Sequence, residues 1–362
     1  MRSPIRFLTG LLLLAVSGCS EGDEGSASAG PASTQQEDSG AETSPGPLDS
    51  GTDANTVDVL VTPPSDGATG DGLSPCEPPP NPAGPDVVLA PPFAGLYRAY
   101  DLGPVPGAPA GTLLGGCVIK YDDTNTLLIA VESERASGAI YAIGVQRDAC
   151  GHIVGFNGIG TPFAATPYVD ANLVYGPNHV LFYSEWPQNK LDQLLPGASS
   201  PALTTDLAAL GVGGGGPGGL GFVPPGLPAA GGLRIITWSA GYWYHLDYVA
   251  DGPTFAISNP VQTATLPNGP GGFAYVPTGS PGFAAQSIIV AEWSQNSVAV
   301  YDSDPQGDPV ETTRRPFFSA FPRPWGAYFE PVTGDFLFLT WGSGTADRVY
   351  VVQGFSKPPS VF

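Results

Sequence analysis

The chain has 362 residues, a formal net charge of −20, 50 glycines and 41 prolines. Because Gly and Pro interrupt regular secondary structure, their density excludes long helices and favours short β-strands joined by turns. The charge is unevenly divided: residues 20–85 hold twelve Asp or Glu and no Lys or Arg, whereas the chain from residue 86 onward holds 21 acidic and 11 basic residues. An acidic surface repels polyphosphate, so nucleic acid is excluded as a partner.

Residues 1–18 have the layout of a secretory signal peptide. Arg2 and Arg6 precede an apolar run from Phe7 to Val16, and small residues follow it. The run is far shorter than the ~20 residues that a membrane-spanning helix needs. This arrangement predicts export and removal of the segment.

The motif Val16-Ser17-Gly18-Cys19 resembles the lipobox of bacterial lipoproteins. The resemblance implies cleavage before Cys19, diacylation of its thiol and usually acylation of the new amino group, with palmitate among the acyl chains. The alternative is an ordinary secretory peptide with an incidental cysteine. Ser20 directly follows the cysteine that would be lipidated. A residue other than Asp at this position resembles the outer-membrane delivery signal of many Gram-negative lipoproteins. We therefore expect a lipid-anchored protein of the cell envelope, preferentially in the outer membrane, since two or more acyl chains anchor a protein stably.

Residues 19–85 form the second predicted region, a disordered acidic linker that starts at the lipidated cysteine. From residue 20 to residue 85 the chain is rich in Ser, Gly, Ala, Thr, Pro, Asp and Glu and contains no aromatic residue. Such a composition cannot offset the entropy of ordering the chain. A flexible linker of this length spans on the order of 45 Å, which would hold the following domain away from the membrane.

Residues 86–362 contain five copies of a pattern about 50 residues long. Each copy has a first strand that begins with small residues, an apolar second strand that ends in an acidic residue or Trp, and a third strand. The first strands are expected at 115–121, 171–175, 218–224, 271–277 and 325–331. The second strands are expected at 127–132, 180–185, 233–239, 287–292 and 335–341. The third strands are expected at 139–144, near Leu191, and at 242–246, 297–301 and 348–352. The equivalent small residues Gly116, Ala171, Gly219, Gly272 and Gly326 are 55, 48, 53 and 54 residues apart.

This period predicts an all-β fold, a β-propeller of five four-stranded blades, or six if one copy has diverged too far to see. A lone blade cannot bury both faces, so the blades must stack on one another. The last copy has no room for a fourth strand, whereas residues 95–102 (GLYRAYDL) lie unpaired before the first copy and are expected to close the ring. The repeat resembles blades of the NHL and gluconolactonase-like propeller superfamily, whose members usually have six blades and include scaffolds, lactonases and binding modules.

The turns after the second strands are expected to meet around one mouth of the propeller. They would bring together carboxylates and aromatic side chains suited to holding a cation or stacking on a sugar. The candidate binding residues at this rim are Glu132, Glu185, Trp238, Glu292 and Trp341. The alternative is that these residues merely end their strands and meet solvent.

The absence of a recognisable catalytic motif favours a binding or scaffold module for a protein or glycan, with no cofactor, over an enzyme. The alternative is a divalent-metal-dependent hydrolase or lactonase, in which Glu132, Glu185 and Glu292 would hold an ion such as Ca²⁺ at the mouth. Gluconolactonase-like enzymes bind their metal partly through a Glu early in the first blade. Here Gly115-Gly116-Cys117 occupies that position, and no acidic residue matches.

Three cysteines remain beside Cys19, and an exported protein is expected to pair two of them. Cys117 opens an inner strand on the upper rim, whereas Cys150 lies in a turn on the opposite rim. The preferred disulfide is therefore Cys76 with Cys150.

Overall fold

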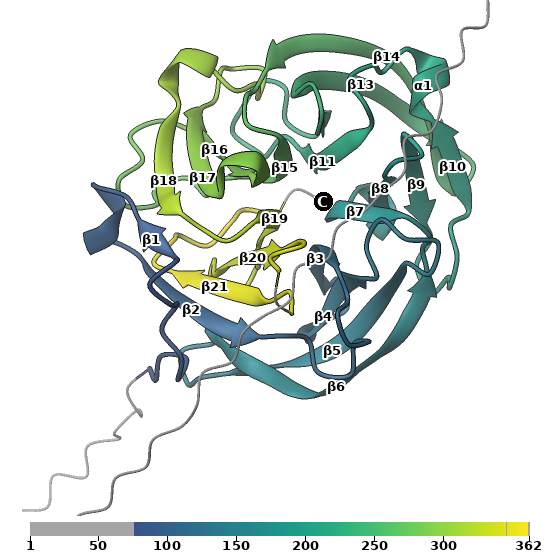
Figure 1. Cartoon of the computed structure of the whole chain (residues 1–362). Helices are drawn as coiled ribbons and strands as arrows, with labels where there is room; N and C mark the ends of the chain where they lie inside the picture. Colours follow the sequence, from purple (N-terminus) through teal and green to yellow (C-terminus); the bar gives the residue numbers. More distant parts are fainter. Residues whose placement is uncertain (1–75, 345, 361–362) are drawn as a thin grey trace, which may run out of the picture. The chain divides into compact units, whose positions relative to one another are not determined.

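The computed structural model describes residues 76–344 and 346–360, which belong to one compact unit, Ala68–Phe362. Five antiparallel sheets surround a central axis and form a five-bladed β-propeller (Figure 1). The predicted fold is confirmed, with five blades rather than six. Cys19, the signal segment and residues 19–75 of the expected linker lie outside the described residues. Within the described part of the chain, no helix is long and apolar enough to cross a membrane.

The first three blades are each continuous in sequence. The first contains β3 (Leu114–Lys120), β4 (Asp123–Val131), β5 (Ala139–Arg147) and β6 (Ile153–Ala165). The second contains β7 (Val169–Tyr175), β8 (Leu181–Glu185), β9 (Lys190–Leu194) and β10 (Leu203–Asp206). The third contains β11 (Pro217–Phe222), β12 (Leu233–Thr237), β13 (Tyr242–Asp251) and β14 (Thr254–Thr265).

The last two blades each include a strand from the N-terminal part of the domain. The fourth contains β15 (Pro270–Tyr275), β16 (Ser287–Glu292), β17 (Ser297–Asp302) and β18 (Arg315–Ala320), with β1 (Val88–Leu89) added at its edge. The fifth contains β19 (Pro324–Phe329), β20 (Phe336–Thr340), β21 (Val349–Gln353) and β2 (Arg98–Gly103). The helical elements are the single turn α1 (Leu207–Leu210) and the 3₁₀ turns η1 (Phe93–Gly95), η2 (Pro177–His179), η3 (Trp293–Gln295) and η4 (Glu311–Thr313).

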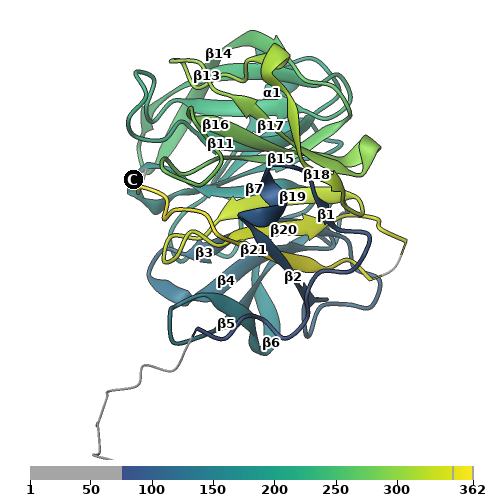
Figure 2. The same cartoon turned by 90° about the vertical axis from the view of Figure 1, so that its left-hand side faces the viewer.

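The ring is closed by β2, as expected for the unpaired segment that precedes the first blade. It pairs antiparallel with β21, with Ala99 opposite Val352 and Tyr100 opposite Val351. Figure 2 shows the two strands side by side. Joining the first and last parts of the domain in one sheet leaves β21 paired on both sides, so no backbone edge is exposed there.

Small residues recur in the inner strands because these strands approach one another closely at the axis. A Cβ on Gly116 would lie 2.5 Å from Cα of Asn172, and one on Gly326 would lie 2.3 Å from the carbonyl oxygen of Gly115. Any larger side chain at either position would therefore collide with a neighbouring backbone. Asn172 uses the space between the strands: its amide donates to the Ala327 carbonyl at 2.9 Å and accepts from the Phe273 N–H at 3.1 Å.

The hydrophobic core lies in layers between neighbouring blades. In the largest layer, Phe317, Phe318 and Phe321 from the fourth blade pack against Phe336 and Phe338 of the fifth, and all five are fully buried. Full burial of a side chain of this size contributes roughly 1.5–3 kcal/mol. Each blade thus depends on its neighbour for burial, which is why five copies of a short repeat make one domain.

Residues 76–85, which composition assigns to the linker, pair with the propeller. The Ala83 N–H donates to the Ala99 carbonyl at 2.9 Å, and the Asp101 N–H donates to the Asn81 carbonyl at 2.9 Å. Cys76 and Cys150 form a disulfide with Cα atoms 5.4 Å apart, and Cys117 is a free, buried thiol. The folded unit therefore begins before residue 86, because backbone bonds and a disulfide hold a segment that has few apolar side chains.

Candidate functional site

The ends of the second strands meet the starts of the inner strands at one mouth of the propeller. The sheet register places Val169 opposite Glu185 and Pro270 opposite Glu292. The backbone N–H that follows the second strand bonds to the carbonyl just before the inner strand of the same blade, as from Trp186 to Tyr168 at 3.0 Å. This bond recurs in all five blades, so the same position of each repeat is held at the same rim.

In four blades the residue that makes this bond is a tryptophan. Together with Trp325 of β19 and Glu134, these residues line a cavity of about 70 Å³, which we call the tryptophan mouth; its lining residues are Glu134, Trp186, Trp238, Trp293, Trp325 and Trp341. Five of the six tryptophans in the chain are therefore gathered at one place. In the first blade Ser133 makes the equivalent bond, to Leu113, and the neighbouring Glu134 lines the cavity.

The indole rings support one another at close range, largely edge to face. Ring centroids are 6.0 Å apart for Trp186 and Trp238, 5.8 Å for Trp238 and Trp293, and 5.7 Å for Trp293 and Trp341. The Trp293 indole N–H donates to the Trp341 backbone carbonyl at 2.9 Å. Such contacts orient the rings before any ligand arrives. Trp325 is buried, whereas the other four are half-buried and reachable from solvent.

A pair of carboxyl groups lies at the tryptophan mouth. Asp170, on β7, is fully buried; it accepts a hydrogen bond from the Trp325 indole N–H at 3.0 Å and interacts with the Glu134 carboxyl. Burial raises the pKa of Glu134 to about 8. Burial and the nearby Glu134 charge raise the pKa of Asp170 well above its usual range. Two such carboxyl groups cannot easily both ionise, so the pair holds a proton at neutral pH.

The backbone at Glu134 is also unusual. Its φ is 62°, in the left-handed region that residues other than Gly seldom adopt. Its N–H donates to the Val169 carbonyl of the next blade at 3.0 Å, which holds the turn in this conformation. Strained residues of this kind concentrate at functional sites.

The structure divides the five rim residues expected from sequence into two groups. Trp238 and Trp341 line the tryptophan mouth. The three glutamates are each engaged within their own blade. Glu132 accepts from Arg135 at 3.1 Å, Glu185 lies 3.8 Å from the Lys190 ammonium, and Glu292 is fully buried and accepts from Arg314 Nε at 2.7 Å.

Because each of the three glutamates already has a basic partner, none is left free to hold a metal ion together with the other two. Glu132, Glu185 and Glu292 do not form a common cluster, and no group of three or more His, Cys, Asp or Glu in residues 76–344 and 346–360 is placed to hold a metal ion. The residues present therefore do not fit the three-glutamate ion site considered from sequence.

Sequence reasoning missed four lining residues: Trp186, Trp293, Trp325 and Glu134. A signal for two of them was present, because Glu185-Trp186 and Glu292-Trp293 end their strands in the same way as Thr237-Trp238 and Thr340-Trp341. Comparing the copies by their aromatic residue, not by the carboxylate before it, identifies all four equivalent tryptophans. Glu134 has no such signal, since it belongs to the one copy that departs from the pattern.

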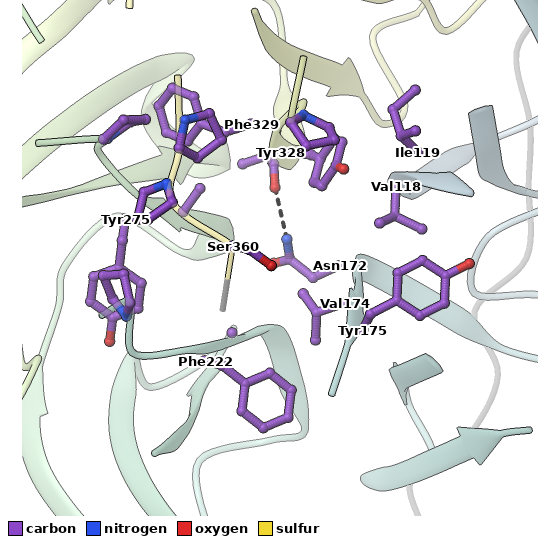
Figure 3. Close-up of a pocket in the computed structure, with 18 of the residues that line it drawn as sticks. Val118, Ile119, Asn172, Val174, Tyr175, Phe222, Tyr275, Tyr328, Phe329 and Ser360 are labelled. Atoms are coloured by element: carbon purple, nitrogen blue, oxygen red, sulfur yellow. Dashed lines mark hydrogen bonds between the residues drawn. The ribbon is translucent and has the colours of Figure 1, made fainter. Parts of the chain in front are cut away.

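The opposite mouth holds a larger cavity of about 350 Å³ (Figure 3). It is lined mainly by apolar side chains at the ends of the inner strands, including Tyr175, Phe222 and Tyr275, with Asn172 among them. The C-terminal residues 358–360 also line it. The cavity is therefore partly filled by the chain itself, and it lies at the end of the inner strands away from the tryptophan mouth.

No protein-family model and no curated protein sequence matches the chain. Among solved structures, a gluconolactonase from Xanthomonas campestris is 13% identical with a TM-score of 0.45, over 77% of this chain and 98% of that one. A luciferin-regenerating enzyme is 12% identical with a TM-score of 0.41, over 77% and 100%. An auxiliary nutrient binding protein from Bacteroides ovatus is 10% identical with a TM-score of 0.42, over 74% and 75%. At such identities no substrate or activity transfers to this chain.

Proposed function

We propose that this protein is a lipid-anchored binding module of the cell envelope, whose propeller binds a protein or glycan ligand at the tryptophan mouth. The observation that carries the proposal is the convergence of five of the six tryptophans on one rim. Half-buried indoles offer large, rigid apolar surfaces together with a polar N–H, a combination enriched in binding sites. The acidic segment that precedes the domain would serve as the spacer from the membrane.

The binding half of the proposal is tested with the purified full-length protein in detergent. Ligands would be sought on a glycan array and by pull-down, and tryptophan fluorescence would then measure affinity for each hit. Trp238→Leu should weaken binding by at least about tenfold, as expected for an aromatic contact of 2 kcal/mol or more. The matched control is Tyr121→Ala, because Tyr121 is an exposed ring at the opposite mouth. Equal losses in the two variants, or none in Trp238→Leu, would contradict the assignment of the site.

The anchoring half depends on Cys19. In the cells that express it, the wild-type protein should incorporate labelled palmitate and fractionate with membranes, preferentially the outer membrane. Cys19→Ser should lose the label and leave the membrane fraction. A serine variant that stays on the membrane without label would show that another segment holds the protein.

A metal-dependent hydrolase or lactonase is the second candidate, favoured by the equivalent positions of Glu132, Glu185 and Glu292 in three blades. Against it, each of these carboxylates has a partner within its own blade. The decisive measurements are metal analysis of the purified protein and thermal unfolding with and without Ca²⁺. A bound divalent ion, or turnover that depends on rim carboxylates, would overturn the binding-only assignment.

A further inference from the structure

The size of the tryptophan mouth limits what can enter it. Its volume of about 70 Å³ is several times what one water needs, roughly 10–15 Å³ on the same scale. It is far below the roughly 300–1,000 Å³ of pockets that enclose drug-sized molecules. The cavity thus suits one compact group of a few heavy atoms, with the remainder of a ligand outside.

The chemistry of the lining selects among compact groups. Aromatic rings carry a negative face, which attracts cations, and tryptophan is the strongest of the three aromatic residues in this respect. The guanidinium of Arg323 already lies 4.1 Å from the centroid of the Trp293 ring, so this rim makes a cation–π contact in the protein itself. No Lys, Arg or His lines the cavity.

The carboxyl pair adds a source of negative charge. Asp170 is fully buried; it accepts from the Trp325 indole N–H and shares a hydrogen bond with the Glu134 carboxyl group, which lines the cavity. The basic group nearest in sequence, Arg135, is engaged by Glu132. A buried carboxyl pair that shares one proton beside an aromatic cavity is the kind of site a cation completes, because the cation can take the place of that proton.

A methylated cation fits this cavity better than a plain ammonium group. An ammonium group brings three N–H donors that need acceptors when they are buried. Glu134 is the only acidic or amide side chain in the lining, and the other lining residues are indoles, which accept no conventional hydrogen bond. A quaternary ammonium group has no N–H donor, so it can be enclosed by indole faces without such a penalty.

We infer that the tryptophan mouth binds a quaternary ammonium group, the trimethylammonium end of a small choline-like molecule, enclosed by the tryptophans and facing the Glu134–Asp170 pair. This inference rests on the proposed function in taking the tryptophan mouth as the binding site, and it names a small molecule in place of the protein or glycan ligand. The rest of such a ligand would extend from the mouth into solvent.

The test uses matched small probes on the full-length protein, with binding followed by tryptophan fluorescence and calorimetry. Choline and tetramethylammonium should bind. 3,3-Dimethylbutan-1-ol, which has the shape of choline without its charge, should bind at least about tenfold more weakly. Ethanolamine, which keeps the charge without the methyl groups, should also bind at least about tenfold more weakly. A trimethyllysine peptide is included to detect a protein-borne source of the same group.

Variants separate the charge from the rings. Glu134→Gln with Asp170→Asn preserves shape and removes the negative charge that the pair carries, so choline affinity should fall at least about tenfold. Trp238→Leu should lower affinity for choline, whereas Tyr121→Ala should not. Circular dichroism and thermal unfolding check that each variant is folded, and the probe comparison on the wild type stands even if the double variant is not.

Proton linkage gives an independent readout. Glu134 interacts with Asp170 on β7, which accepts from the Trp325 indole N–H of β19. The other charged groups at this rim are the Glu132–Arg135 pair on the same turn and Arg323, which lies against the Trp293 ring. Because the pKa of Glu134 is raised to about 8, a bound cation should displace a proton, so choline affinity should rise from about pH 6 to about pH 8. The double variant should lose this rise.

Equal affinity for choline and its neutral analogue would overturn the inference, as would no saturable binding of either quaternary cation. Preference for the peptide over choline would overturn the choice of a small molecule while keeping the cation site. If the cations fail but another ligand depends on Trp238, the proposed binding site stands and only the ligand class is wrong. If no ligand depends on Trp238, the proposed function fails with it.

Discussion

Glu134→Gln should make the protein more stable at alkaline pH and leave its stability unchanged in mild acid. Burial raises the pKa of Glu134 to about 8, from about 4.5 when exposed. The folded state therefore keeps a proton that the unfolded chain has lost. The protonated Glu134 therefore contributes its full share of folding stability below about pH 4.5, and that share is lost progressively as the pH rises through about 8. Glutamine mimics the protonated form and does not titrate.

The magnitude follows from the slope for one proton, about 1.4 kcal/mol per pH unit. Between about pH 5 and about pH 8 this gives an upper limit of about 4 kcal/mol, and because Glu134 is partly exposed we expect about 2 kcal/mol. Urea unfolding of the wild type and the variant across this range measures the difference. Glu185 and Asp335, whose pKa values are also raised, are common to both proteins and cancel, whereas Asp170 titrates together with Glu134 and belongs to the measured difference. If the free energy of unfolding changes with pH in the same way in the two proteins, the reasoning is refuted.

Three further changes test the structure away from the proton linkage. Arg314→Met should destabilise the domain by about 3–5 kcal/mol in urea unfolding, because it leaves the fully buried Glu292 carboxylate without its cation. Gly326→Ala should lower the unfolding midpoint by an amount equivalent to about 1–3 kcal/mol, since its Cβ meets a backbone carbonyl at 2.3 Å. Replacing Cys76 and Cys150 by serine removes a disulfide between residues 74 positions apart, which frees the unfolded chain, and should lower stability by about 2–4 kcal/mol in thermal unfolding.

Each of these changes has a comparison. Arg315→Met removes a half-exposed arginine whose partner Asp302, at 3.0 Å, is also partly exposed, so its effect should stay below about 1 kcal/mol. If it equals that of Arg314→Met, burial of the carboxylate is not the cause. Gly95→Ala places a Cβ where no atom lies within 4 Å and should be tolerated; an equal loss there would contradict the steric argument. Unchanged stability of the serine variant under non-reducing conditions would count against the disulfide.

Much of the fold could be predicted because it is repetitive. Gly116, Gly219, Gly272 and Gly326 recur at a steady interval, and the structure shows why: each stands where inner strands approach too closely for a side chain. The closing strand could also be predicted, since residues 95–102 had no partner in their own copy and the last copy lacked a fourth strand. Residues 76–85 were misassigned because backbone hydrogen bonds, which leave no mark in composition, hold them.

The candidate site could be predicted only in part. The rim itself follows from repeat geometry, and Trp238 and Trp341 line the cavity there. The glutamates were expected to face the mouth together, but side-chain direction depends on local partners, such as Arg314 for Glu292. These partners lie in the same blade as their glutamates but at a different position in each copy, so the repeat does not reveal them.

The sequence by itself determined the β-propeller, its strand order and the rim on which a ligand site would form, because periodic burial and turn residues are local properties of the chain. Only the tertiary structure decided which side chains enclose the cavity. Glu134 meets Asp170 and Trp325 there, although they come from three different blades. Their proximity, and the raised pKa that follows from shared burial, arises from the stacking of blades around the axis, which no single repeat encodes.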